Sequence, residues 1–153
     1  MSTFDLKQVP SQKGRIAVVT GSNIGLGYET VLALAKKDAK VILACRSLDK
    51  AKDAIEKIKS QAPKADLEAI QIDLSKLNSV DDFAEKYLKK YDQLDLLINN
   101  AGVMMPPYTV TDDGFELQLA ANHLGHFKLT GLLMDTIEKT SNSRIVSLSS
   151  NAH

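Results

Sequence analysis

Short apolar runs alternate along this chain with segments in which apolar residues recur at helical spacing. Uninterrupted apolar runs are typical of strands buried on both faces, as in a parallel sheet. The third run differs, because Ile70, Ile72 and Leu74 alternate with polar residues. The pattern predicts five strands, at Ile16–Val19, Val41–Cys45, Leu67–Leu74, Leu94–Ile98 and Ile145–Leu148.

Segments between these runs have the spacing of amphipathic helices. We expect helices over Gly27–Lys37, from a cap at Ser47 to about Ser60, and over Gly114–Glu138. Ser79 and Asp82 have the Ser-x-x-Asp spacing of a capping box, which predicts another helix start at Ser79.

Strands separated by helices of this length indicate βαβ units with right-handed crossovers. The fold class is therefore α/β, a Rossmann-type doubly wound parallel sheet. We predict the strand order 3-2-1-4-5, because a glycine-rich turn follows the first strand. No linker divides the chain, so residues 1–13 are read as an N-terminal extension and 14–153 as one NAD(P)-binding domain.

Composition excludes several classes of protein. The 153 residues carry 19 basic and 19 acidic side chains with no concentrated basic face, so we expect no nucleic-acid partner. Cys45 is the only cysteine, which rules out an internal disulfide and favours a reducing compartment. The first residues lack the apolar core of a signal peptide, and no apolar run approaches the roughly 18 residues that span a bilayer. A cytoplasmic protein without a membrane segment is expected.

The turn Thr20-Gly21-Ser22-Asn23-Ile24-Gly25-Leu26-Gly27 lies between the first strand and the first helix. Glycines let backbone amides approach a ligand, and a helix N-terminus favours a pyrophosphate. The alternative is a tight structural turn, which three glycines in this context disfavour. A P-loop is excluded because no Gly-Lys-Ser/Thr follows.

This Thr-Gly-x-x-x-Gly-x-Gly spacing resembles the short-chain dehydrogenase/reductase family. Three further matches follow in the family's order, namely Asp73-Leu74, Asn99-Asn100-Ala101-Gly102 and the strand from Arg144 to Ser150. The resemblance covers residues 14–153, and the sequence around Asn99 and Asn122 is similar to that of the retinol dehydrogenase-like branch. It implies an oxidoreductase that interconverts an alcohol and a carbonyl compound by hydride transfer.

The resemblance also implies which residues bind the coenzyme. In dinucleotide folds, an acidic residue about 20 positions after the glycines meets the ribose. Here Cys45 and Arg46 stand at that place, and Arg46, assisted by Ser47 and Lys50, suits the 2′-phosphate of NADP. NAD is the less favoured coenzyme, and two alternatives stay open: Arg46 as a solvated residue, or Asp49 as the ribose acid. The predicted coenzyme-binding residues are Gly21, Ser22, Asn23, Ile24, Gly25, Gly27, Arg46, Asp73, Leu74, Asn99, Ala101 and Gly102.

For catalysis, the resemblance implies Asn122 as holder of a relay water and Ser150 as partner of the substrate oxygen. The family's catalytic Tyr-x-x-x-Lys segment follows the serine strand, and this sequence stops at His153. We therefore expect a partial sequence, inactive alone; the alternative is a non-catalytic NAD(P)-binding module. His123 and His126 lie three apart, but no metal site is expected, because no further ligands match. The helix over 114–138 is a candidate surface for a homodimer or homotetramer.

Overall fold

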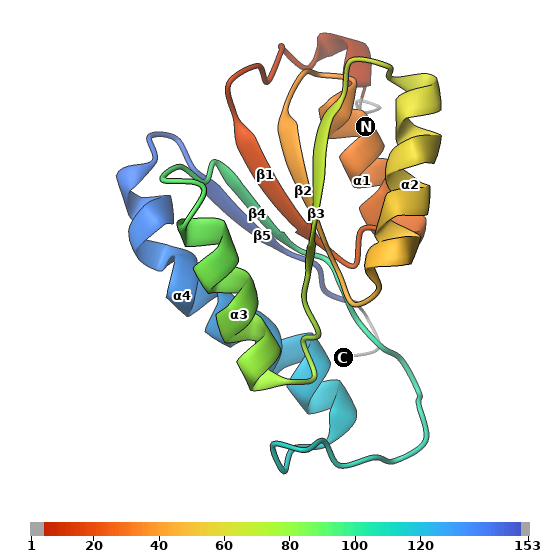
Figure 1. Ribbon diagram of the computed structural model, residues 1–153, viewed down its shortest axis with the longest axis vertical. Helices are drawn as coiled ribbons and strands as arrows, with labels where there is room; N and C mark the ends of the chain where they lie inside the picture. The colour runs from red at the N-terminus through yellow and green to blue at the C-terminus, as the bar shows by residue number, and fades with distance from the viewer. Residues whose placement is uncertain (1–4, 151–153) are drawn as a thin grey trace.

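The computed structural model describes residues 5–150, which form a five-stranded parallel sheet between two layers of helices (Figure 1). The strand order β3-β2-β1-β4-β5 confirms the prediction. β1 lies at the centre, where Val18 pairs with Ile42 of β2 on one side and with Leu97 of β4 on the other. The strands are β1 (Ile16–Thr20), β2 (Lys40–Cys45), β3 (Asp66–Gln71), β4 (Leu96–Asn99) and β5 (Arg144–Ser147).

Helices α1 and α2 cover one face of the sheet, and α3 and α4 cover the other (Figure 1). Each layer buries its own apolar core, because the side chains of a strand point alternately to the two faces. In β1, for example, Val18 packs toward α3 and α4, whereas Val19 packs toward α1 and α2. The helices are the 3₁₀ turn η1 (Leu6–Gln8), α1 (Gly25–Ala35), α2 (Leu48–Gln61), α3 (Leu77–Leu88), the π-helix η2 (Leu119–Leu124) and α4 (Gly125–Lys139).

Two helix starts differ from the expectation. The capping box at Ser79 is wrong, because α3 already begins at Leu77. The Ser79 hydroxyl instead accepts a hydrogen bond from the Asp73 amide at 2.9 Å, so it fixes the segment after β3. The long helix begins later than residue 114, because Val110 and Glu116 form an isolated antiparallel bridge. Its first part is π-helical, which the sequence pattern did not indicate.

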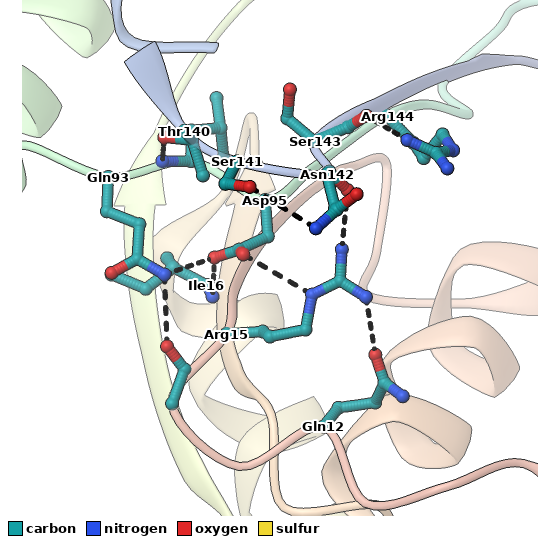
Figure 2. A network of polar contacts seen from close by, with 12 residues as sticks. Gln12, Arg15, Ile16, Gln93, Asp95, Thr140, Ser141, Asn142, Ser143 and Arg144 are labelled. Carbon is teal, nitrogen blue, oxygen red and sulfur yellow. Dashed lines mark hydrogen bonds and ion pairs between the residues drawn. The ribbon is translucent and has the colours of Figure 1, made fainter. Parts of the chain in front are cut away.

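A polar network joins β1, β4 and β5 at the amino-terminal end of the sheet (Figure 2). The Asp95 carboxylate, 4% exposed, lies at its centre. Its oxygens accept hydrogen bonds from the Ile16 amide at 2.8 Å and from Gln93 Nε2 at 2.6 Å. Arg15 Nε lies 3.3 Å from the same carboxylate, and its guanidinium also donates to the Asn142 carbonyl. The network therefore fixes where β1 and β4 begin relative to each other.

Within residues 5–150, no helix has the length and apolar character needed to cross a membrane. The same part of the chain contains no group of three His, Cys, Asp or Glu side chains that could hold a metal ion. His153 lies outside the described residues.

Candidate functional site

A cavity of about 540 Å³ opens at the carboxyl ends of the central strands. Four segments line it: the β1–α1 turn, the end of β2, the residues after β3 and the loop after β4. In open α/β sheets, ligands bind in this crevice, where strand order reverses. Here β2 and β4 lie on opposite sides of β1. The connection from β1 to β2 runs through α1 on one face of the sheet, and the connection from β3 to β4 runs through α3 on the other, so the cavity opens between them (Figure 1).

The glycine turn is packed so tightly that two glycines have no room for a side chain. A Cβ on Gly21, whose φ is +63°, would lie 2.8 Å from the Ala101 Cα. A Cβ on Gly27 would lie 2.5 Å from the Gly21 carbonyl oxygen. The turn thus presents main-chain atoms to the cavity, and the chain continues from it into α1. The N-terminus of this helix carries a partial positive charge that stabilises anions. Ile24, the N-cap residue, makes no side-chain capping bond.

Ser22 points away from the cavity. It is fully buried, and its hydroxyl lies 3.3 Å from the Cys45 Sγ. Burial raises the pKa of the Cys45 thiol, which keeps it protonated and argues against a reactive cysteine. The two side chains therefore fasten the glycine turn to the end of β2.

The loop after β4 is held against the glycine turn by Thr20. The Thr20 Oγ1 accepts hydrogen bonds from the amides of Asn100 at 2.9 Å and Ala101 at 3.0 Å. The Asn100 side chain donates in return to the Thr20 carbonyl at 2.8 Å. These bonds fix the Asn-Asn-Ala-Gly motif beside the first glycine of the turn.

Basic and acidic side chains occupy different parts of the same cavity. Arg46, Ser47 and Lys50 line it at the end of β2, and Arg46 and Lys50 are exposed. Gln71 donates to the Arg46 carbonyl at 3.0 Å, which fixes the backbone there and leaves the guanidinium in solvent. Asp73 lines the cavity next to β3, where its Oδ1 accepts from the Ser75 amide and hydroxyl.

A second cavity, of about 670 Å³, adjoins the first across the loop after β4. Asn122 and Ser150 both line it, although 28 residues separate them in sequence. The Asn122 side chain is already engaged: Oδ1 accepts from the Val103 amide and Nδ2 donates to the Val103 carbonyl, both at 2.8 Å. Asn122 therefore clamps the loop, and Ser150 lies exposed three residues after the end of β5.

The two cavities bring together most of the residues predicted from sequence. Asn99, Ala101 and Gly102 line the second cavity, and Ala101 and Gly102 also line the first. Ser22 and Gly25 belong to the glycine turn but line neither cavity. Lining the first cavity are Gly21, Asn23, Ile24, Gly27, Arg46, Asp73, Leu74, Ala101 and Gly102.

His126 has a role in the site that sequence reasoning missed. It is 7% exposed, and its ring lies 2.9 Å from Thr20 Oγ1 and 3.1 Å from the Asn122 carbonyl oxygen. Burial lowers the pKa of this imidazole below its ordinary value. The available signal was the four-residue spacing from Asn122, which places both on one helix face.

The family model of the short chain dehydrogenases matches residues 15–153. The chain belongs to this family. Among curated relatives, Retinol dehydrogenase 13 from Homo sapiens is 44% identical over 140 residues, which cover 92% of this chain and 42% of that protein. Retinol dehydrogenase 11 from Mus musculus is 46% identical, with 92% and 44% covered. The chain therefore resembles the retinol dehydrogenases and spans less than half the length of these relatives.

Two solved structures share the fold of this chain. A crystal structure of an uncharacterized protein from Mycobacterium Paratuberculosis superposes with a TM-score of 0.85 at 39% identity, covering 99% of this chain and 52% of that one. The Pseudomonas aeruginosa RhlG/NADP active-site complex superposes with a TM-score of 0.76 at 26% identity, covering 92% and 56%.

Proposed function

We propose that this short chain dehydrogenase functions as an NADP-dependent oxidoreductase, which interconverts an alcohol and a carbonyl compound by hydride transfer. One observation supports this most strongly: a single cavity joins the glycine turn to Arg46, Ser47 and Lys50. A diphosphate bound at the turn and a ribose phosphate near Arg46 are the two anionic parts of one NADP molecule. The names of the relatives as dehydrogenases favour this over a non-catalytic binding module.

The residues present fit this coenzyme. No Cβ fits at Gly21 or Gly27, so bare main chain faces the place proposed for the diphosphate. Arg46 and Lys50 supply positive charge beside the 2′-phosphate, and Asp73 would meet the adenine. The RhlG complex, which contains NADP, is a relative with this fold. When bound, the reduced nicotinamide supplies the hydride.

The second cavity is the proposed place of the substrate. Ser150 would donate a hydrogen bond to the substrate oxygen, and thereby orient the carbonyl carbon for attack. Asn122 lines the same cavity and holds Val103 in place. A relay water at Asn122, a cytoplasmic location and assembly through residues 114–138 stay predictions.

Calorimetry on the purified chain tests the coenzyme assignment. We expect NADPH to bind more tightly than NADH. A charge-assisted hydrogen bond contributes about 1.5–3 kcal/mol, so Arg46→Ala should weaken NADPH binding at least about tenfold. It should leave NADH binding nearly unchanged. Arg144→Ala, which removes another exposed arginine at the opposite end of the sheet, is the matched control. Equal affinities for the two coenzymes would overturn the NADP assignment.

A further inference from the structure

His126 lies where three parts of the site meet. It belongs to the first turn of α4, and its ring reaches Thr20 at the end of β1. Nε2 lies 2.9 Å from Thr20 Oγ1, and Nδ1 lies 3.1 Å from the carbonyl oxygen of Asn122. Both neighbours connect directly to the loop after β4, Thr20 through two amides and Asn122 through Val103.

The donors and acceptors around this ring favour one protonation state. The Asn122 carbonyl can only accept, so Nδ1 must carry a proton. The Thr20 oxygen has two lone pairs, and the amides of Asn100 and Ala101 donate to both. Its hydroxyl is therefore left to donate, and two acceptors are within reach: Nε2 at 2.9 Å and the Ile98 carbonyl oxygen at 3.4 Å. The shorter contact favours Nε2, which then accepts without a proton of its own.

We propose that His126 is a positioning residue: a neutral Nδ1–H imidazole that couples Thr20, at the end of β1, to the main chain of Asn122. The contacts form a closed circuit from Thr20 to Ala101, along the loop to Val103, across to Asn122 and back through His126. Both ends of the segment 100–103 are thereby held to the same ring. Since this segment lines both cavities, the imidazole sets their relative position.

The backbone around Asn122 supports the assignment. Asn122 lies in the π-helix, where the Gly125 amide bonds to the Ala120 carbonyl five residues earlier. Such wide turns are uncommon and occur often at functional sites. Burial, which lowers the pKa of His126, favours the neutral form that the donor count requires; the hydrogen bond to Asn122 acts in the opposite direction.

The tautomer can be observed in the unmodified chain. Nitrogen-15 NMR of the labelled histidine rings distinguishes a protonated ring nitrogen from an unprotonated one. For His126 at neutral pH we expect protonated Nδ1 and unprotonated Nε2. A Thr20→Val variant should shift the Nε2 resonance, because it removes the hydroxyl donor. An Nε2–H tautomer or an imidazolium would overturn the proposal, even if the chain binds no coenzyme.

The coupling to the coenzyme rests on the proposed function and is tested separately. His126→Phe should weaken NADPH binding about tenfold, as expected for one lost positioning hydrogen bond. His126→Asn, whose amide can still donate to the Asn122 carbonyl, should recover part of that loss. Adding Thr20→Val to His126→Phe should cost less than the sum of the two changes. Thr136→Val, at another buried threonine farther along α4, should leave NADPH affinity unchanged.

The outcomes separate the two proposals. If the unmodified chain binds no NADPH, the proposed function fails, whereas the tautomer assignment still stands on the NMR result. If the unmodified chain binds NADPH and folded His126→Phe binds it equally well, the positioning role is wrong. If His126→Phe does not fold, the NADPH affinity of His126→Asn is the test. A partial loss of affinity in that variant supports the coupling, and an affinity equal to that of the unmodified chain contradicts it.

Discussion

Asp95 provides the sharpest test of how the amino-terminal end of the sheet, opposite the site, is held together. The substitution Asp95→Asn keeps the shape of the side chain and replaces one acceptor oxygen with an NH₂ donor. Three N–H donors surround the carboxylate, from Ile16 at 2.8 Å, Gln93 at 2.6 Å and Arg15 at 3.3 Å (Figure 2). One remaining oxygen cannot accept from donors on both sides, so at least one of them must face the new NH₂ group.

The expected cost follows from burial. Ile16 and Gln93 donate to the same oxygen, Oδ2, which the amide oxygen of asparagine can replace, so both bonds change from a charged to a neutral acceptor. This change costs about 1–1.5 kcal/mol per bond, because a hydrogen bond contributes about 1.5–3 kcal/mol to a charged acceptor and about 0.5–1.5 kcal/mol to a neutral one. The ion pair adds only about 0–1 kcal/mol, because the Arg15 side chain is 32% exposed and screened by solvent. We therefore expect Asp95→Asn to lower the free energy of unfolding by about 3 kcal/mol.

Urea denaturation measures this change, with the denaturant slope checked for constancy. The control is Arg15→Gln, which removes the ion pair and the hydrogen bonds from the guanidinium to Gln12 and Asn142, and leaves Asp95 bonded to the Ile16 amide. These contacts are partly exposed, so the variant should cost about 1–2 kcal/mol, less than Asp95→Asn. If Arg15→Gln costs as much as Asp95→Asn, the ion pair dominates and the reasoning is wrong. The same holds if Asp95→Asn is as stable as the unmodified chain.

Two further predictions concern the site itself. Gly27→Ala should destabilise the chain by about 1–3 kcal/mol and abolish NADPH binding, because the added Cβ would clash with the Gly21 carbonyl oxygen. Urea denaturation measures the stability and calorimetry measures the affinity. An unchanged affinity for NADPH would show that the tight packing of Gly27 is not needed for binding. The stability of the chain should fall as the pH drops below about 6.5, because the lowered pKa of His126 means that the unfolded chain takes up the proton first. This contribution levels off below the pKa of His126 in the folded chain. The test is a plot of the urea midpoint against pH, and the prediction is wrong if a His126→Phe variant has the same slope as the unmodified chain.

Local patterns in the sequence predicted the sheet and most of the site. Buried strands such as Val41–Cys45 are continuous apolar runs, and the glycine turn marks the point where strand order reverses. Because the carboxyl ends of parallel strands share one edge, motifs distant in sequence, such as Gly21 and Ala101, were expected at one place.

Contacts that depend on tertiary packing were not predictable in this way. Ser79 has the spacing of a helix cap, yet its hydroxyl bonds to Asp73, because α3 begins earlier. The link from His126 to Thr20 joins residues 106 positions apart, and no periodic pattern encodes it. Asp95 likewise acts through donors on β1, which no local pattern on β4 indicates.

The central claim is that the glycine turn and the loop after β4 together hold a nicotinamide dinucleotide. Titrating the nitrogen-15-labelled chain with NADP⁺ and following each backbone amide by NMR tests it most directly. We expect saturable shifts at the amides of residues 21–27 and 99–102, with smaller changes in α2. Saturable shifts confined to other parts of the chain, or none at millimolar coenzyme, would contradict it.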